Sequence, residues 1–339
     1  MKKINARKVN IPIFVSHRGC LHDCVFCNQK RITGRSGSVT PAQAHEIIKC
    51  ALSTIDIENT CVEIAFFGGS FTAIPVCEQE ALLKVAHSYI KNGAVSGIRL
   101  STRPDCISMD ELSMLKSYGV TSIELGVQST DEEVLEKSRR GHSYADVVCA
   151  AQMINEFGFE LGLQMMLGLP GDTREKSIKT ARDIIALSPK TARIYPTLII
   201  RDSALAFMYE RGEYDPISLE EAVLVCAEIY TMFRENKIEV LRMGLMASED
   251  MCEGKGIIAG PFHPSFGELV FSRLYLLKMR DMIRGCNKKQ ITLRVNPREL
   301  SKALGNKRCN IETIKNEQGV KIELKCDENV DCGELLWYV

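Results

Sequence analysis

Segments with strand character alternate with segments of helical period over roughly the first 235 residues of the chain. Strands are expected at 9–16, 62–67, 97–102, 122–127, 161–167 and 192–200, and helices at 41–54, 77–91, 110–118, 131–137, 144–157, 173–187 and 219–236. This alternation with short connections predicts a parallel sheet with helices outside it. Six such units are fewer than the eight of a closed barrel, so the expected fold is α/β, a partial (β/α)6 TIM-like barrel.

Chemistry in such a barrel is expected at the C-terminal ends of the strands. The first strand is followed by C-L-H-D-C-V-F-C, which places Cys20, Cys24 and Cys27 on one short loop. Three thiolates can converge on one soft metal centre, and thiolates hold iron–sulfur clusters. A structural zinc site is the alternative, but its fourth ligand, His22, lies between the cysteines and would have to fold back.

The compartment follows from the absence of export signals. The first 20 residues lack the apolar run of a secretory signal, and no stretch has the ~18 apolar residues of a membrane span. A cytoplasmic location with no membrane partner is therefore expected, and clustered cysteines there bind metal more often than they form disulfides. Most other cysteines are expected to be small buried hydrophobes, although Cys309, Cys326 and Cys332 could in principle bind a second cluster.

The C-x3-C-x2-C loop resembles the signature of the radical S-adenosylmethionine (SAM) enzymes, including the aromatic Phe26 before the last cysteine. The resemblance implies that Cys20, Cys24 and Cys27 hold a 4Fe-4S cluster whose open iron chelates the methionine part of S-adenosyl-L-methionine. It also implies that one electron cleaves SAM to methionine and a 5′-deoxyadenosyl radical. An electron donor such as flavodoxin or ferredoxin is therefore an expected partner.

Further motifs follow the later strands: F-F-G-G-S-F-T at 66–72, S-T-R-P-D at 101–105, I-E-L-G-V-Q-S at 123–129, R-R-G-H-S at 139–143 and Q-M-M-L-G-L-P-G at 164–171. With I-Y-P-T-L at 194–198 and G-P-F-H-P-S-F-G at 260–267, this series resembles one branch of the superfamily. That branch contains the catalytic subunit of Elongator and, more distantly, oxygen-independent coproporphyrinogen oxidase. About 70 residues follow Gly267, too few for the acetyltransferase domain of the Elongator subunit, so acetyl-CoA chemistry is not expected.

The same resemblance implies a set of cofactor-binding residues: Phe26, Gly68, Gly69, Ser70, Ser101, Gln128, Arg140 and Gln164. The two glutamines could hydrogen-bond ribose hydroxyls, and Arg140 could pair with the methionine carboxylate. Ser101 stands where relatives often carry an acidic residue. His142 and His263 are expected near the pocket without an assigned role.

The pattern changes after residue 285, which predicts a barrel with its extension at 1–285 and a small α+β module at 286–339. Its β-α-α-β order resembles a KH domain, whose G-x-x-G loop clamps a nucleic-acid backbone. Gly305, Asn306, Lys307 and Arg308 occupy that loop, with Arg308 in place of the second glycine. Residues 286–325 contain ten Lys or Arg and four Asp or Glu, an excess that the zero net charge of the chain conceals.

A basic, backbone-clamping module beside a radical SAM barrel predicts an enzyme that modifies an RNA nucleotide in tRNA or rRNA. A small metabolite or tetrapyrrole substrate, with the module as a lid or dimer contact, is one alternative. A cluster-containing RNA-binding protein without turnover is another. The oligomeric state does not follow from the sequence.

Overall fold

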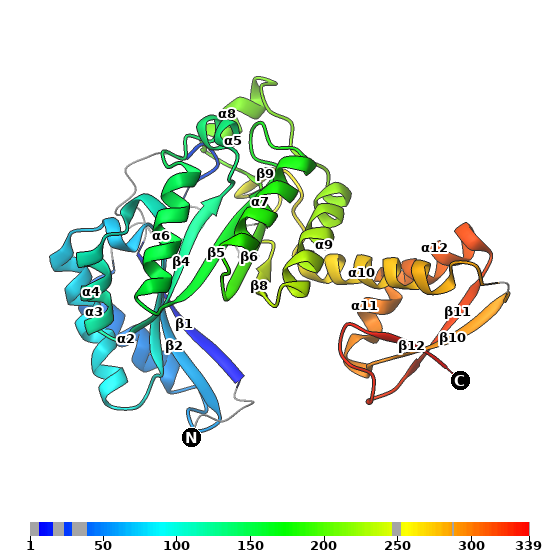
Figure 1. Ribbon diagram of the computed structural model, residues 1–339, viewed down its shortest axis with the longest axis horizontal. Helices are drawn as coiled ribbons and strands as arrows, with labels where there is room; N and C mark the ends of the chain where they lie inside the picture. Colours follow the sequence, from blue (N-terminus) through cyan, green and yellow to red (C-terminus); the bar gives the residue numbers. More distant parts are fainter. Residues whose placement is uncertain (1–6, 16–23, 29–38, 246–251, 287, 339) are drawn as a thin grey trace.

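A computed structural model of the chain describes residues 7–15, 24–28, 39–245, 252–286 and 288–338. Within these ranges, seven strands form the main sheet, in the order β1-β2-β3-β4-β5-β6-β8. All neighbouring strands are parallel, and the sheet forms an open, partial barrel (Figure 1). The strands are β1 (Arg7–Val15), β2 (Thr60–Gly68), β3 (Gly97–Thr102), β4 (Val120–Gln128), β5 (Glu160–Leu167), β6 (Thr191–Pro196) and β8 (Glu239–Met243).

Two sequence predictions about the strands are corrected. The count of six was one short, because β8 lies at the edge of the sheet, where its exposed or partly exposed side chains lack a buried apolar run. The predicted strand at 192–200 is two strands, since β6 ends at Pro196, which has no N–H to donate. Ile199–Ile200 (β7) pairs instead with Ile257–Ala259 (β9) in a separate antiparallel sheet.

Helices cover one face of the main sheet, and the opposite, concave face is polar. In β3, Ile98 and Leu100 are buried in the core, whereas Arg99 and Ser101 alternate with them and face the other way. The helices between the strands are α2 (Pro41–Leu52), α3 (Val76–Lys91), α4 (Met109–Ser117), α5 (Glu132–Lys137), α6 (Tyr144–Glu156), α7 (Arg174–Ala186), α8 (Ala204–Glu210) and α9 (Leu219–Glu235). Helix α2 begins with a capping box, in which the Thr40 side chain accepts from the Gln43 N–H.

Helix α10 (Phe266–Ile283) extends from the barrel into the C-terminal module (Figure 1). Phe266 and Val270, in its first half, belong to the barrel core. Tyr275 and Met279, in its second half, belong to the separate core of the module. The helix is therefore shared by both cores. No helix in the described ranges is long and apolar enough to cross a membrane.

The module contains the predicted β-α-α-β order as β10 (Gln290–Val295), α11 (Leu300–Leu304), α12 (Cys309–Gln318) and β11 (Lys321–Cys326). An additional strand, β12 (Leu335–Trp337), follows β11 in a segment for which the sequence analysis expected no strand. The strand order is β11-β10-β12, with β11 parallel and β12 antiparallel to β10. The likeness to a KH domain and the boundary at residue 286 stay predictions.

Candidate functional site

The described part of the cysteine loop is docked onto two other elements near the carboxyl ends of the strands. Val25 N–H donates to the carbonyl of Ser138 (3.1 Å), and its own carbonyl accepts from Leu205 N–H (2.7 Å) at the start of α8. Cys24 is buried and Cys27 is partly buried, whereas Cys20 lies outside the described residues. Phe26 packs against a small apolar cluster around Val25 and Leu205, which anchors this end of the loop.

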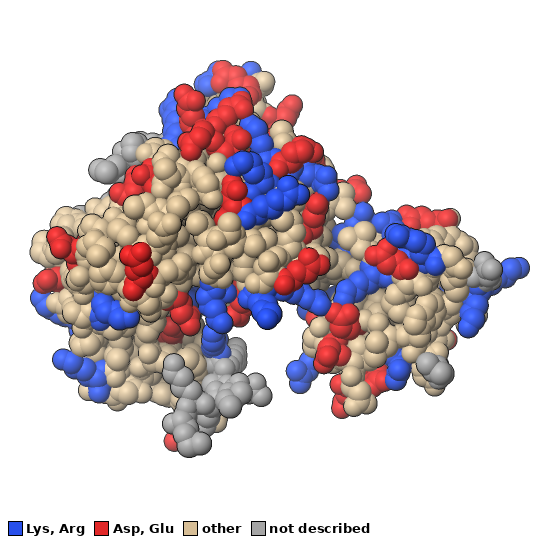
Figure 2. Space-filling view, in the orientation of Figure 1, with Lys and Arg blue, Asp and Glu red and all other residues tan. Residues whose placement is uncertain are grey.

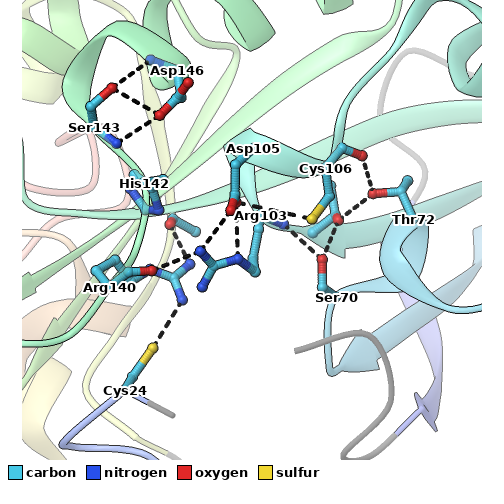
Figure 3. A network of polar contacts seen from close by, with 12 residues as sticks. Cys24, Ser70, Thr72, Arg103, Asp105, Cys106, Arg140, His142, Ser143 and Asp146 are labelled. Atoms are coloured by element: carbon cyan, nitrogen blue, oxygen red, sulfur yellow. Dashed lines mark hydrogen bonds and ion pairs between the residues drawn. The ribbon is translucent and has the colours of Figure 1, made fainter. Parts of the chain in front are cut away.

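Arg140 contacts the cysteine loop from the segment between α5 and α6. Its neighbours Arg139 (φ 51°) and Gly141 (φ 75°) are both left-handed, which turns this short segment sharply. The buried guanidinium donates through Nη1 to Cys24 Sγ (3.3 Å) and through Nη2 to the carbonyl of Gly126 (2.7 Å) (Figure 3). Arg140, predicted from the resemblance, thus lies beside a predicted cluster ligand.

Arg103, which the sequence analysis did not single out, holds Arg140 in place. The Arg103 side chain is 3% exposed and forms a fork on Asp105, with Nε–Oδ1 2.9 Å and Nη2–Oδ2 2.8 Å. Nη2 also donates to the carbonyl of Arg140 (2.7 Å), as Figure 3 shows. Burial opposes the charged form, but Asp105 outweighs it and raises the Arg103 pKa, so the guanidinium stays charged. The sequence feature that could have indicated this pair is an arginine two residues before an aspartate, directly after a strand.

Two buried N–H groups of these arginines find no acceptor among the described residues: Arg103 Nη1 and Arg140 Nε. A buried donor without an acceptor destabilises the folded protein unless a ligand accepts its hydrogen bond. The two cationic side chains also lie where the charge of Cys24, as a thiolate, needs compensation. The residues therefore fit a thiolate-bound cluster with an anionic ligand beside it.

The glycine motif joins the end of β2 to the end of β1, directly before the cysteine loop. Gly68 has φ +110°, and a Cβ there would lie 3.3 Å from the Val15 carbonyl oxygen. Gly69 N–H donates to the same oxygen (2.8 Å). Ser70 is buried; its hydroxyl accepts from Arg103 N–H (3.2 Å) and lies 2.7 Å from Thr102 Oγ1. Ser70 therefore ties β2 to β3, and its contact with a cofactor stays a prediction.

The structure brings Gln128 and Gln164 together on the concave face. Gln164 Nε2 donates to Gln128 Oε1 (3.1 Å). Gln128 is left-handed (φ 66°) at a register shift between β4 and β5, which re-aims its side chain at the end of the strand. These two amides are placed as a pair, as expected for residues that bind one ligand.

Ser101 has an acidic neighbour that the sequence analysis missed. Its hydroxyl donates to Glu124 Oε1 (3.1 Å), and Glu124 Oε2 lies 2.7 Å from Arg193 Nε. The Arg193 guanidinium lies 5.0 Å from the centre of the Phe67 ring. Glu124 lies between Ile123 and Leu125, which are both buried in the core, and the two-residue period of a strand therefore turns Glu124 to the concave face. This alternation was the feature of the sequence from which Glu124 could have been predicted.

His142 does not have the environment of an acid–base group at neutral pH. It is 6% exposed, and Nε2 lies 3.2 Å from the carbonyl oxygen of Val127. Burial, reinforced by the charges of Arg140 and Arg103, lowers its pKa to about 3. The neutral imidazole is therefore a buried structural group.

The predicted RNA-binding residues lie in the module, in the loop that joins α11 to α12. Gly305 has φ +74°, and a Cβ there would approach Cys309 Sγ to 2.6 Å, so this position requires glycine. Lys307 (φ 50°) and Arg308 (φ 64°) are exposed and left-handed, so Arg308 adopts the conformation that favours the glycine it replaces. In the space-filling view, both basic and acidic side chains lie along the notch between barrel and module (Figure 2).

Comparisons with known proteins agree with this geometry. The family model of the radical SAM superfamily matches residues 14–184, and that of the Radical_SAM C-terminal domain matches residues 189–275. An uncharacterized protein of Methanocaldococcus jannaschii is 29% identical over 240 residues, which cover 66% of this chain and 72% of that protein. The tRNA uridine(34) acetyltransferase of Methanocaldococcus infernus is 36% identical over 129 residues, 37% of this chain and 24% of that protein.

The solved structure of an N-terminally truncated archaeal Elp3 from Methanocaldococcus infernus has a TM-score of 0.64 at 22% identity. The match covers 84% of this chain and 66% of that chain, and it shows the same fold. The chain thus matches about a quarter of the length of the acetyltransferase but most of the length of the uncharacterized relative.

Proposed function

Because the chain belongs to the radical SAM superfamily, whose enzymes use a 4Fe-4S cluster and SAM, we propose that this enzyme cleaves SAM to modify an RNA nucleotide. The proposal that the enzyme cleaves SAM is supported above all by the Arg140 guanidinium, whose Nη1 lies 3.3 Å from Cys24 Sγ at the carboxyl end of the sheet. The RNA part is supported by the basic module and by the tRNA named for one relative.

In this proposal, Cys20, Cys24 and Cys27 hold the cluster. The bound cluster supplies the electron that cleaves SAM to methionine and a 5′-deoxyadenosyl radical, and a flavodoxin or ferredoxin would deliver it. Arg140 offers its remaining N–H groups to the methionine carboxylate. Phe26 anchors the loop through its apolar cluster.

The other predicted contacts complete the cofactor site. Gly68 and Gly69 let the methionine amino group approach the backbone at the end of β2. Gln128 and Gln164 face the ribose hydroxyls as a pair. Ser101 acts together with the Glu124 carboxylate, to which it already donates. The loop of Gly305, Asn306, Lys307 and Arg308 contacts the RNA backbone.

The SAM part is tested by anaerobic cluster reconstitution followed by an assay for 5′-deoxyadenosine with a strong reductant. We expect the product from the wild type and from Cys149→Ala, which removes an exposed cysteine on α6. Cys24→Ala should lose both the product and the cluster absorbance. A wild-type protein that binds iron and SAM but forms no 5′-deoxyadenosine would contradict the proposal.

The RNA part is tested by mass spectrometry of nucleosides from the tRNA and rRNA of a deletion strain. We expect one modified nucleoside to disappear and to return when the wild-type gene, but not the Cys24→Ala gene, is restored. An unchanged nucleoside profile would remove RNA as the substrate and favour a small metabolite.

A further inference from the structure

One face of the sheet in the module is not covered by its helices. Ile291, Leu293 and Val295 of β10 are buried in the core that α10, α11 and α12 share with the sheet (Figure 1). The alternating residues face the other way, and most of them are exposed. This outer sheet face consists of Gln290, Thr292 and Arg294 on β10, Lys321, Glu323 and Lys325 on β11, and Leu336 and Tyr338 on and after β12.

The outer sheet face combines an aromatic ring with basic side chains. Tyr338 is 51% exposed, and Lys325 Nζ lies 4.3 Å from the centre of its ring. Tyr338 N–H donates to the Thr292 carbonyl (3.0 Å), which fixes the backbone that carries the ring. Arg294 is held by Asp327 (3.0 Å) at the rim of the face. An exposed ring with an ammonium against it is therefore presented on the outer sheet face.

We propose that the outer sheet face binds single-stranded RNA, with a base stacked on Tyr338 and phosphates bound by Lys321 and Lys325. Single-stranded nucleic acids are bound by the same combination, in which aromatic rings stack on bases and a basic surface follows the backbone. Arg294 on this face is paired with Asp327, and Glu323 also lies here, but neither Lys321 nor Lys325 forms an ion pair within the described residues. Two such cations beside an exposed ring match a polyanion better than an apolar protein partner. The inference rests on the proposed RNA substrate and names where that RNA is held.

This surface is distinct from the loop of residues 305–308. That loop joins α11 to α12, the helices that cover the opposite face of the sheet. A strand of RNA on the sheet would therefore lie on Tyr338 without requiring contact with Lys307 or Arg308. The two surfaces can be separated by mutation.

The test measures binding of a short fluorescein-labelled oligouridine to the full chain by anisotropy. We expect Tyr338→Ala to weaken binding about tenfold, the usual loss for one base–aromatic stack. The matched control is Phe207→Ala on α8, since Phe207 is an equally exposed aromatic residue (54%) on the barrel. Lys325→Ala should reduce the salt dependence of binding, because it removes one phosphate contact.

A fluorescence measurement places the RNA on the face directly. Trp337 is the single tryptophan of the chain, and its pairing with Leu293 puts it on the helix-covered side of the sheet. In the double variant Trp337→Phe/Tyr338→Trp, the only tryptophan stands at position 338 on the outer sheet face. We expect oligouridine to quench the fluorescence of this variant much more than that of the wild type.

Three results would overturn the inference. If Tyr338→Ala binds like the wild type while Lys307→Ala weakens binding, the loop holds the RNA and the proposed function stands without this surface. If the protein dimerises in sedimentation experiments and Tyr338→Ala makes it monomeric, the face is an interface between copies. If the wild type binds no RNA, the RNA substrate fails together with this surface.

Discussion

The buried fork of Arg103 leads to a quantitative prediction for Arg103→Met, which keeps the apolar stem and removes the guanidinium. The variant loses both hydrogen bonds to Asp105 and the one to the Arg140 carbonyl. Breaking a buried ion pair costs about 3–5 kcal/mol when the remaining charge is fully desolvated. The Asp105 side chain is 20% exposed, so water recovers part of this loss. We therefore expect the free energy of unfolding to fall by about 2–3 kcal/mol.

The chain offers a matched control, because Arg211 forms the same fork on a carboxylate two residues later. Its Nε and Nη2 lie 2.6 and 2.7 Å from the Glu213 oxygens. Both side chains are at least half exposed, however (58% and 50%). Exposed pairs are screened by water and contribute little to stability, so Arg211→Met should unfold like the wild type.

The assay is anaerobic urea unfolding followed by far-ultraviolet circular dichroism, with all three proteins in the same cluster-free state. The midpoint should move to lower urea for Arg103→Met alone, with an unchanged slope if the unfolded states expose equal surface. Equal midpoints for the two variants, or a loss below about 1 kcal/mol for Arg103→Met, would refute the claim that burial makes this fork strong.

Three further predictions concern the cofactor site. Gln128→Gly keeps the left-handed backbone (φ 66°) but removes the side-chain amide. Calorimetry should show that SAM binds about threefold to tenfold more weakly while the stability of the protein is unchanged. Equal affinity would contradict a contact between Gln128 and the ribose. Gly68→Ala adds a Cβ 3.3 Å from the Val15 carbonyl oxygen, at a position with φ +110°. The free energy of unfolding in urea should therefore fall by about 1–3 kcal/mol. An unchanged free energy would show that this turn adapts to the added Cβ. His142 has a pKa of about 3 in the folded protein and of about 6.5 in the unfolded chain. Between about pH 3 and 6.5 the unfolded chain therefore binds more protons, so the free energy of unfolding should fall as the pH falls through this range. His142→Asn should flatten this pH dependence in urea titrations, and an unchanged slope would show that His142 is not its source.

The sequence was sufficient to bring together the candidate residues that stand at strand ends. Cys24, Gly68 and Gln128 follow or close the parallel strands β1, β2 and β4, and parallel pairing brings such positions to one edge whatever the details of packing. For these residues, linear order and strand polarity determine the neighbourhood. Arg140 is different, since its motif follows α5 and not a strand, and only the family resemblance pointed to it.

Contacts that depend on register across several strands could not be predicted. Glu124 on β4 meets Ser101 on β3 because these two residues are paired between the strands. Arg193 on β6 is likewise paired with Gln164 on β5. Strand boundaries from periodicity are uncertain by two or more residues, and a shift of one residue would turn each side chain to the other face. The edge strands β8 and β12 were missed because short, half-exposed strands have no buried apolar run to indicate them.

Arg140 shows what the structure adds to a role that the sequence had already suggested. A guanidinium has five N–H donors, and the contacts to Cys24 and Gly126 use two of them. Arg140 can therefore bind a carboxylate with the remaining donors while it keeps both protein contacts. A lysine at this position has three donors around one point and no fork, so it could not hold the loop and a carboxylate in one fixed geometry. In the proposed function, Arg140 would thus connect the loop of the proposed cluster ligands to the binding of the methionine carboxylate, and Arg103 fixes the backbone from which it does so.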